Sequence, residues 1–581
     1  MAVRLAQQAL VCALSVASTM TAHAAGAAWT TPSGTLQGTR YSTLAQITPD
    51  NVAGLTEEFN FPTGVSASHE ASPLVVGTTM YVVTPFPNRL YALDLAQGGK
   101  LLWSFTPEVD EYARGVACCD VVNRGAAYGD GKIVYNALDD STVAVNAVTG
   151  RQVWRTRLGD PATGETITMA PLIVGTRVFV GNSGAELGIR GWIAALDLKT
   201  GKQLWRAYNT GPDADVKIGP SFRPFYAKDR GTDLGVSTWP AEAWRQGGAT
   251  VWGWLTYDPT LDLLFHGTAN PGVWNPDMRP GDNKWGASVF ARKPATGEVV
   301  WAYQFTPHDG WDFDSINENI VADLPIGGQT RKTLVHFDKN GFAYTFDRNS
   351  GELLVAKPFG AVNWASGVDL ATGLPSVDPA KVPHQGATTT DICPSPLGVK
   401  DWEPASYSPK TKLFYVPAIN FCDDLEPLKA QFIAGTPFMG ADIAIKPGPG
   451  GNMGALVAWD GARGRAAWTV NETLPLYGGT LATAGGVVFY GTLDKWLRAV
   501  DAKTGAKLFE TRLDCGVVSG PISFTGADGK QRIAVTTGVG WLAGGFAGGA
   551  CPATRGEWED VPPPRTPPVG GGVVHVFKLA S

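Results

Sequence analysis

The chain has 581 residues, which exceeds the usual size of one compact domain, so either several domains or one large repetitive fold is expected. Its formal net charge is -6 and it contains no basic run, which argues against nucleic acid as a partner because phosphates must be neutralised by cationic side chains. The 71 glycines, 41 prolines and 20 tryptophans indicate a turn-rich, aromatic-rich chain with few long helices, and they favour an all-β architecture.

Residues 1–25 have the pattern of a secretory signal peptide. Arg4 supplies the positive start, residues 9–16 form an apolar core, and residues 22–24 (Ala-His-Ala) form a small-x-small cleavage site. The apolar run is too short to span a bilayer, and no later segment is apolar enough to do so. We therefore expect a periplasmic protein without a membrane span, whose mature chain begins at residue 26.

Six cysteines follow the signal: Cys118, Cys119, Cys393, Cys422, Cys515 and Cys551. In an oxidising compartment this even number permits three disulfides, in fifteen possible pairings. The sequence has no Cys-x-x-Cys-His motif, so covalently attached haem is not expected. Any electron transfer must therefore end on a separate partner.

Cys118 and Cys119 are neighbours in the sequence. A disulfide between neighbours closes almost no chain, so loop-closure entropy cannot account for it. Such a pair suggests a flat, rigid surface against which a ligand lies. The alternative is two free, buried thiols that happen to be adjacent.

A segment with an apolar strand, an acidic turn, Thr-Gly or its equivalent, and usually a Trp recurs along the chain. The copies are Leu90–Trp103, Val143–Trp154 and Ile193–Trp205, further copies ending at Trp301 and Trp468, and degenerate ones at Val355 and Phe509. Each predicts a strand, a tight turn and a strand, with the Trp wedged between neighbouring sheets. The spacing of the first three copies, roughly fifty residues, suits the four-stranded blades of a propeller.

These repeats predict one large propeller of about eight blades. Wide gaps at 209–287 and 361–455 leave room for another blade and for long insertions, where function usually resides. Residues 573–577 form a strand that would complete the first blade and join the two ends of the ring. We therefore expect residues 26–581 to be a single propeller domain.

Three clusters contain most of the candidate site chemistry: residues 182–186, residues 250–254 followed by 268–274, and residues 307–314. Four oxygen-bearing side chains stand in them: Glu186, Asn270, Asp312 and Asp314. No His or Cys cluster competes with them, so the set suits a hard cation such as calcium or a harder one.

Asp312 and Asp314 are two positions apart, so in an extended strand both point to the same face. Two carboxylates forced together repel each other unless a cation or a shared proton lies between them. The alternative is that both are turn formers, because Gly310 and Asn317 flank them.

Two further stretches, Arg279-Pro-Gly-Asp-Asn-Lys-Trp285 and Gly478-Gly-Thr-Leu-Ala-Thr-Ala-Gly485, extend these motifs over nearly the whole mature chain. Together with the clusters, they resemble the pyrroloquinoline quinone (PQQ) dependent alcohol dehydrogenases of the methanol/ethanol type. The resemblance implies an eight-bladed propeller that holds a planar quinone between a Cys118–Cys119 disulfide and the ring of Trp252. An indole stacks on a conjugated ring, and the constrained disulfide gives a rigid opposing wall.

The resemblance also implies which other residues hold the cofactor: Glu70, Arg124, Thr168, Ser183, Gly184, Ala185, Lys339 and Asp401. Lys339 stands where methanol dehydrogenases of this kind usually have Arg. It can donate to the quinone as a point charge but not as a bidentate fork. Tyr477 replaces a Trp commonly found near the cofactor. These departures favour a primary or secondary alcohol larger than methanol.

By the same resemblance, Glu186, Asn270 and Asp312 bind a metal that polarises the quinone carbonyl. Asp312 is then the general base that takes the alcohol proton while hydride passes to the quinone. Asp314 stands where calcium-dependent members carry a small uncharged residue, and an Asp there marks members that use lanthanides. Three carboxylates balance a trivalent ion, whereas with calcium the site would be over-charged. We therefore expect one lanthanide ion, with Ca²⁺ as the alternative.

Two more disulfides are expected. Cys393 and Cys422 would form a structural bridge. Cys515 could pair with Cys551 and so pin the glycine-rich stretch 538–551 near the mouth of the site.

The sequence thus predicts a periplasmic quinoprotein that oxidises a small alcohol to the aldehyde or ketone, passes electrons to a soluble c-type cytochrome and could form a homodimer. One alternative is a calcium-dependent PQQ dehydrogenase that acts on an aldehyde or sugar. Another is a non-catalytic propeller that scaffolds envelope assembly. The Trp repeats alone would fit the scaffold, but it has no use for Cys118, Cys119 and the carboxylate cluster.

Overall fold

The computed structural model describes residues 28–549 and 571–580 of the chain. The predicted signal peptide, residues 1–25, therefore lies outside the described residues. Most of the regular secondary structure in the described chain is β-strand, which confirms the all-β prediction. The α-helices are short: α1 (Tyr112–Val116), α2 (Asp213–Val216), α3 (Leu234–Ser237) and α4 (Trp541–Phe546). No helix among the described residues is long and apolar enough to cross a membrane.

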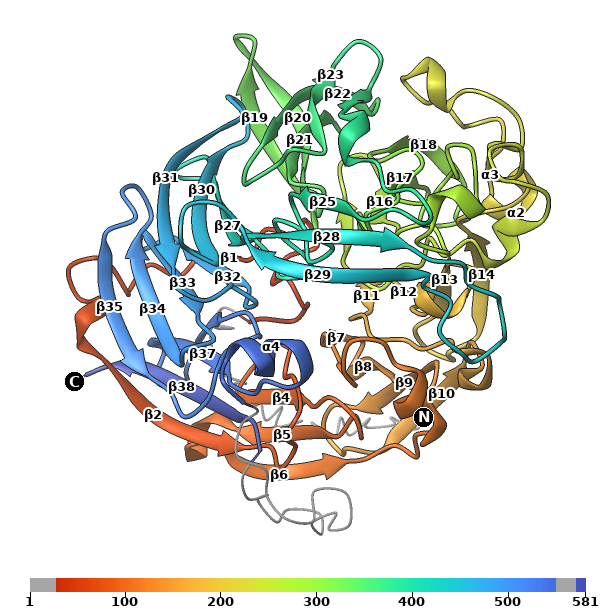
Figure 1. The fold of residues 1–581 in the computed structure, drawn as a ribbon. Coiled ribbons are helices and arrows are strands. Elements are labelled where there is room, and N and C mark those ends of the chain that lie inside the picture. The colour runs from red at the N-terminus through yellow and green to blue at the C-terminus, as the bar shows by residue number, and fades with distance from the viewer. Residues whose placement is uncertain (1–27, 550–570, 581) are drawn as a thin grey trace, which may run out of the picture.

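Eight sheets of four or more strands lie around a central axis (Figure 1). Four consecutive strands form each of five sheets: β3 (Leu74–Val76), β4 (Thr79–Val83), β5 (Leu90–Asp94) and β6 (Lys100–Phe105); β7 (Ala126–Gly129), β8 (Lys132–Ala137), β9 (Ser141–Asn146) and β10 (Gln152–Arg157); β11 (Leu172–Val174), β12 (Arg177–Gly181), β13 (Trp192–Asp197) and β14 (Gln203–Tyr208); β15 (Leu255–Asp258), β16 (Leu263–Gly267), β17 (Ser288–Arg292) and β18 (Val299–Gln304); β19 (Asn319–Ile326), β20 (Gln329–Phe337), β21 (Phe342–Asp347) and β22 (Glu352–Pro358).

The other three of these sheets use more distant strands. They are β26 (Ser406–Ser408), β27 (Leu413–Ile419), β30 (Gly454–Asp460) and β31 (Arg465–Glu472); β32 (Thr480–Thr483), β33 (Val487–Gly491), β34 (Trp496–Asp501) and β35 (Lys507–Arg512), with β1 (Tyr41–Ser42) parallel to β32; and β36 (Ile522–Thr525), β37 (Gln531–Thr536), β38 (Val573–Leu579) and β2 (Leu55–Pro62).

The last of these sheets joins the two ends of the described chain. β38 pairs with β37 on one side and with β2 on the other. The expectation that residues 573–577 join the ends of the ring agrees with this pairing, but the strand lies in a sheet with β36, β37 and β2 and not in the sheet of the first repeat, β3–β6. The eighth sheet is thus built from both ends of the chain. The gaps at 209–287 and 361–455 therefore contain no additional four-stranded sheet among the described residues. They contain the first strands of the β15–β18 sheet and of the sheet of β26, β27, β30 and β31, whose last two strands are predicted repeats, together with insertions.

The seven predicted repeats form the last two strands of seven sheets. In each of these hairpins the antiparallel register shifts once near the turn, as between Ala195 and Leu196 in the β13–β14 pair. The Trp then reaches the next sheet, because Trp154 Nε1 donates to Leu198 O at 3.0 Å. A Cβ on Gly201 would lie 2.6 Å from the Trp154 ring, so this turn requires glycine.

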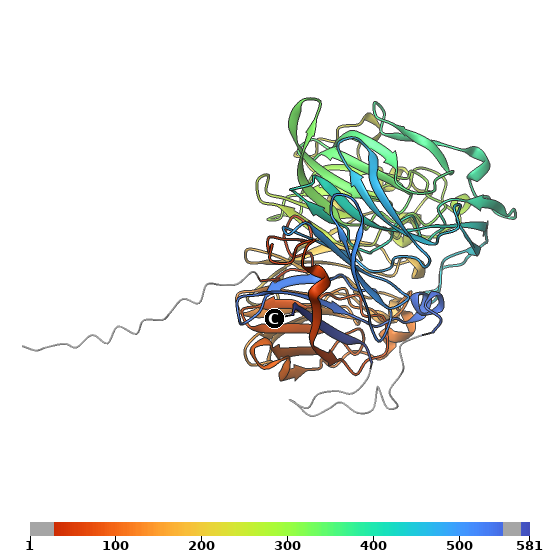
Figure 2. The same ribbon diagram turned by 90° about the vertical axis from the view of Figure 1, so that its left-hand side faces the viewer.

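Two small sheets lie among the insertions: β23 (Ala365–Asp369) with β24 (Leu374–Val377), and β25 (Thr389–Ile392) with β28 (Phe421–Pro427) and β29 (Ala441–Pro447). The β28–β29 hairpin runs across one face of the ring (Figure 1), and α4 lies on the same side as the hairpin in the view from the side (Figure 2). The loop 428–440 that joins β28 to β29 is called the strap below.

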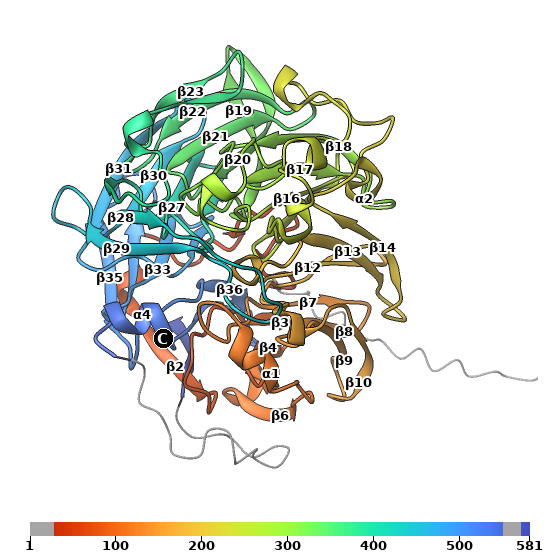
Figure 3. The ribbon, with the colours of Figure 1, turned by 45° about the vertical axis from the view of Figure 1, so that its right-hand side comes forward.

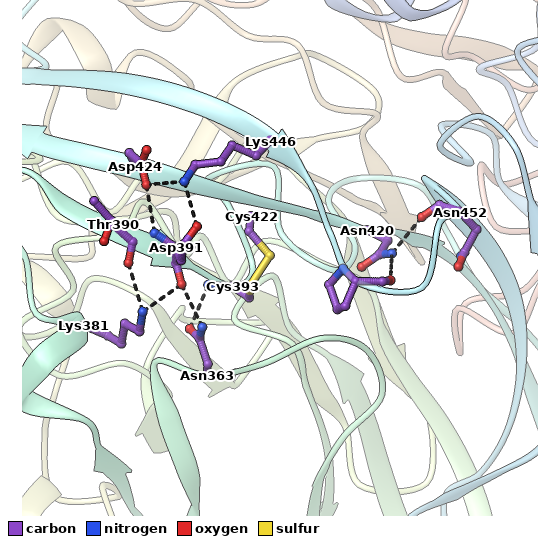
Figure 4. Close-up of a disulfide and its surroundings, with 11 residues drawn as sticks. Asn363, Lys381, Thr390, Asp391, Cys393, Asn420, Cys422, Asp424, Lys446 and Asn452 are labelled. Atoms are coloured by element: carbon purple, nitrogen blue, oxygen red, sulfur yellow. Dashed lines mark hydrogen bonds and ion pairs between the residues drawn. A yellow bond between two sulfur atoms is a disulfide. The ribbon is translucent and has the colours of Figure 1, made fainter.

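A disulfide between Cys393 and Cys422 ties β28 to the segment that follows β25, as predicted. Beside it, Lys446 on β29 donates to the carboxylates of Asp391 and Asp424 at 2.7 and 2.6 Å (Figure 4). The hairpin is therefore held at its base by one covalent bond and by an ion-paired cluster.

Candidate active site

Glu70 and Arg124 form a buried ion pair at the centre of the predicted cofactor residues. Glu70 precedes β3 and Arg124 precedes β7, and Arg124 Nε lies 2.9 Å from Glu70 Oε2. Burial raises the pKa of Glu70 to about 8, even though Arg124 acts in the opposite direction. The carboxylate is therefore short of partners that stabilise its charge.

Hydroxyl groups extend this pair toward the next sheet. Arg124 Nη1 donates to Thr168 Oγ1 at 2.7 Å, and Thr168 Oγ1 lies 2.9 Å from Ser183 Oγ. Backbone bonds from Arg124 N to Thr168 O and from Ser183 N to Thr166 O align the three segments. The structure thus brings together four predicted residues that lie up to 113 positions apart in the sequence.

Two indole rings lie beside the same guanidinium. The Arg124 Cζ atom is 4.7 Å from the centre of the Trp252 ring and 5.5 Å from that of Trp402. Trp252 was predicted to cover one face of a planar ligand. Trp402 was missed, although it directly follows Asp401, because nothing in its local sequence separates it from a core tryptophan.

Cys118 and Cys119 are joined by a disulfide, so the alternative of two free thiols is wrong. The pair follows α1, and the Cys119 side of it is exposed. Asp120 anchors this turn near the Glu70 segment, because its Oδ2 accepts a hydrogen bond from Ser68 N at 3.0 Å. The disulfide is thereby fixed close to the Glu70–Arg124 pair.

Asp312 and Asp314 converge on one ammonium group. Lys339 Nζ donates to Asp312 Oδ2 and to Asp314 Oδ2, each at 2.8 Å. Asp314 Oδ1 accepts a further bond from Asn270 N at 2.7 Å. Burial raises the pKa of Asp312, with Asp314 and Glu186 adding to the effect against Lys339.

The prediction that Asp312 and Asp314 point to one face of an extended strand is wrong, because neither aspartate lies in a strand. They lie in the loop between β18 and β19, and Asp312 has a φ of +63°, in the left-handed region. The side chain of Asp309 shapes the loop, since its two oxygens accept from Trp311 N and Phe313 N at 2.9 Å. Asp309 is a buried organiser of the site that sequence reasoning did not single out.

Glu186 lies in the short helical turn Ala185–Leu187 (η4), which directly follows Gly184. Burial raises the pKa of Glu186 to about 7, and Asp314 adds to the shift. Gly184 has a φ of +115°, and a Cβ there would lie 2.5 Å from Gly164 O, so only glycine fits.

Asp401 closes the site on the side of the β26–β31 sheet. Asn317 Nδ2 donates to Asp401 O at 2.5 Å, and Asp401 N donates to Glu403 Oε2 at 2.8 Å. Burial raises the pKa of Asp401, while Lys339 acts to lower it. Glu403 is a buried carboxylate that sequence reasoning missed; burial raises its pKa to about 8.

Several buried polar atoms around this site have no hydrogen-bond partner. They are Asn270 Oδ1, Asp312 Oδ1, Asp401 Oδ1, Glu403 Oε1 and the Tyr477 hydroxyl. Leaving such groups unpaired costs free energy, so native proteins rarely do so without a functional reason. Their clustering fits a polar ligand that supplies the missing partners.

The donor set also fits a cation. Glu186, Asp312 and Asp314 are carboxylates whose charges interact with one another, and Asn270 adds an amide oxygen. Among the described residues, however, no three Asp, Glu, His or Cys side chains lie close enough together to hold a metal ion as they stand. The ammonium of Lys339 lies between two of the carboxylates and offsets part of their charge.

Cys515 is disulfide-bonded, whereas Cys551 lies outside the described residues, so the pairing of these two stays a prediction. Residues 538–549 are described, and α4 lies within them. Phe546 of α4 stacks on Phe421 with ring centres 5.0 Å apart. The glycine-rich stretch therefore packs against the β28–β29 hairpin.

A family profile described as PQQ, glucose/ethanol/alcohol dehydrogenase, β-propeller domain, matches residues 29–357 and 451–533. The chain is 46% identical over 517 residues to the lanthanide-dependent methanol dehydrogenase of Methylacidiphilum fumariolicum, covering 88% of this chain and 85% of the relative. It is 42% identical over 530 residues to methanol dehydrogenase [cytochrome c] subunit 1 of Methylobacterium organophilum, covering 89% and 84%. A solved europium-containing methanol dehydrogenase superposes with a TM-score of 0.90 at 43% identity, covering 95% and 98%.

Proposed function

Because the chain belongs to the PQQ-dependent glucose, ethanol and alcohol dehydrogenase family, we propose that it oxidises a small alcohol to the corresponding aldehyde or ketone. It is an oxidoreductase that acts on a CH–OH group. The observation that carries the proposal is the convergence of Asp312, Asp314 and Lys339 beside buried oxygens that lack partners.

PQQ would lie between the Cys118–Cys119 disulfide and the ring of Trp252. Its polar edge would contact the residues that the fold brings together or that the family pattern implies: Glu70, Arg124, Thr168, Ser183, Gly184, Ala185, Lys339 and Asp401. When bound, the quinone supplies the acceptor for the hydride of the alcohol. The protein's contribution is to orient the ring and to provide the missing hydrogen-bond partners.

Glu186, Asn270, Asp312 and Asp314 would bind one metal ion. Three carboxylates in a buried site favour a trivalent lanthanide over calcium, because calcium would leave the repulsion among them less compensated. Ca²⁺ remains the alternative ion. The similarity to lanthanide-dependent relatives supports the first choice.

Asp312 would be the general base. Both oxygens of Asp314 already accept hydrogen bonds, from Asn270 N and from Lys339, whereas Asp312 Oδ1 has no partner. Asp312 Oδ1 is therefore the oxygen of this pair that can receive the alcohol proton without giving up an existing bond.

The arrangement of the eight sheets supports a proposal for the architecture of the whole chain. We propose that the eight sheets are the blades of one propeller domain over residues 26–581, with the Trp contacts as its docking motifs. Residues 1–25 would direct the chain to the periplasm. A soluble c-type cytochrome would accept the electrons there, in line with the name of the subunit 1 relatives. A homodimer stays a prediction.

Dye-linked alcohol oxidation tests the function directly. Apoprotein is supplied with PQQ and either a light lanthanide or Ca²⁺, and turnover is measured over primary and secondary alcohols of increasing length. We expect alcohol-dependent turnover with the lanthanide and much less with Ca²⁺. Equal turnover with both ions would contradict the metal assignment, and turnover of aldehydes or sugars alone would favour the calcium-dependent alternative.

A further inference from the structure

The strap forms hydrogen bonds with two segments that carry proposed metal ligands, the segment of Glu186 and the segment of Asn270. Phe438 N donates to Glu186 O at 2.6 Å, so it holds the backbone of one ligand itself. Trp274 N, four residues after Asn270, donates to Met439 O at 2.8 Å. One short loop, drawn from a distant part of the chain, therefore bridges the Glu186 and Asn270 segments.

Further contacts fix the strap at its base and at its tip. Leu428 N donates to Gly440 O at 2.8 Å, and Asn275 Nδ2 donates to Leu428 O at 2.9 Å. At the tip, Gly435 N donates to Thr163 O at 3.0 Å. The strap thus extends from the β28–β29 hairpin to the sheets that contain β7–β14, as Figure 3 shows.

An aromatic side chain of the strap packs on Gly188, two residues after Glu186. A Cβ added to Gly188 would lie 2.7 Å from the Phe432 ring, so the ring rests on the turn that carries the ligand. The ring centres of Phe432 and Phe438 are 5.7 Å apart in an edge-to-face arrangement. Ile433, the next residue, is 58% exposed and points to solvent.

The ligand segments need such support because neither ligand lies in a strand. Glu186 lies in the helical turn η4, and Asn270 lies in the loop after β16. Carboxylates that approach one another repel, so Glu186 would move away from Asp312 and Asp314 unless its segment is held. Groups that orient the ligands of a metal ion strongly influence its affinity.

We propose that the strap is a positioning element that sets the separation of Glu186 and Asn270 and thereby the affinity for a trivalent cation. This inference rests on the proposed function, because it takes those residues as metal ligands. The strap acts through backbone bonds and the Phe432 ring, and it contributes no ligand of its own.

Excision of the strap is the first test. Leu428 and Gly440 already pair at the end of the hairpin, so residues 429–439 can be replaced by Asn-Gly to give a two-residue turn. The full-length protein is loaded with PQQ, and the Tb³⁺ dissociation constant is measured by sensitised luminescence against a competing chelator. We expect it to rise by about tenfold or more, as for lost orienting contacts in other metal sites. PQQ binding, followed by absorption, should stay stoichiometric.

Point variants give the same test without altering the backbone. Phe432→Ala should weaken Tb³⁺ binding several-fold, Phe432→Leu should restore most of it, and the neighbouring Ile433→Ala is the matched control that should leave it unchanged. A merely structural role would instead lower the thermal midpoint of the apoprotein and leave the Tb³⁺ dissociation constant of the folded protein unaltered.

The outcomes separate the two proposals. Equal Tb³⁺ dissociation constants in wild type and Phe432→Ala would overturn the role of the strap, even if the excised form does not fold. If the PQQ-loaded wild type bound no Tb³⁺, the metal site itself would be refuted, and the strap's role with it.

Discussion

At the scale of single residues, Asp312 and Asp314 share one counter-ion but differ in what remains free. Lys339 contacts both carboxylates at the same distance, so it does not distinguish them. The bond from Asn270 N does, because it engages Asp314 alone. The pair thereby separates into Asp312, with one oxygen that has no partner, and Asp314, whose two oxygens each accept a hydrogen bond, which supports Asp312 as the base.

Asp312→Asn keeps the shape of the side chain and removes its basicity. We expect kcat to fall by about a hundredfold or more, the usual contribution of a general base, while PQQ still binds. Stopped-flow reduction of bound PQQ by the alcohol measures the step. Asp323→Asn, at a carboxylate that is 54% exposed, is the control. Near-normal turnover of Asp312→Asn would show that the base lies elsewhere.

Asp314→Ala removes the third carboxylate and should abolish lanthanide-supported turnover while leaving quinone binding measurable. The physical reason is charge, since two carboxylates balance a divalent ion better than a trivalent one. Titration of PQQ-loaded protein with La³⁺ and with Ca²⁺ checks it. Retention of the wild-type preference for La³⁺ would contradict this role of Asp314.

The site residues that could be predicted from the sequence are those in short motifs. Asp312 and Asp314 stand two positions apart, and Cys118 and Cys119 are adjacent, so each pair is visible without the fold. Glu403 could not be predicted, because only burial shows that its carboxylate is unusual. The left-handed φ of Asp312 could not be predicted either, since tertiary contacts impose it on the loop.

At the scale of elements, Trp154 shows how one sheet holds the next. Its ring is buried and its Nε1 donates to Leu198 O, while Val153 beside it is 45% exposed. We expect Trp154→Ala to lower the free energy of unfolding by about 3–5 kcal/mol, as for large buried aromatic residues. Val153→Ala should change it little, as is usual for an exposed position. Denaturant titration compares the two, and equal losses would contradict a specific role of the ring.

Seven of the repeats could be predicted because each keeps its hairpin within one stretch of sequence. The eighth is divided, since β2 and β38 come from opposite ends of the chain and leave no continuous motif. Phe59 takes the place of the Trp there, and a Cβ on Gly99 would lie 2.3 Å from its ring. The strap could not be predicted either, because its hydrogen bonds join positions that are far apart in the sequence.

At the scale of the whole molecule, His575 on β38 contacts both β2 and the loop between β35 and β36. Its Nδ1 lies 2.7 Å from Glu57 Oε1 and its Nε2 lies 2.9 Å from Asp514 Oδ1. Burial alone would lower the pKa of His575, but Asp514 and Glu57 outweigh it and raise the pKa above its ordinary value of 6.5. Protonated His575 therefore stabilises the closed ring.

The stabilisation by His575 is complete below pH 6.5 and is lost as the pH rises through the raised pKa. We expect the thermal midpoint of the wild type to fall more steeply than that of His575→Gln as the pH increases from about 6 to about 8.5. His384→Gln, at a histidine whose side chain is 64% exposed, is the control. Parallel profiles for wild type and His575→Gln would contradict the role of this histidine.

The pairing of β2 with β38 has a consequence for how the protein is made. The contact between Glu57 and His575 spans 518 positions, so β2 emerges from the ribosome long before its partner exists. While the chain is being synthesised, β2 has an unpaired edge whose N–H and C=O groups can hydrogen-bond to strands of other chains. The effect of a premature stop codon shortly before residue 573 would therefore not be limited to the loss of β38. It would release a nearly full-length chain whose ring cannot close and in which the edge of β2 stays unpaired.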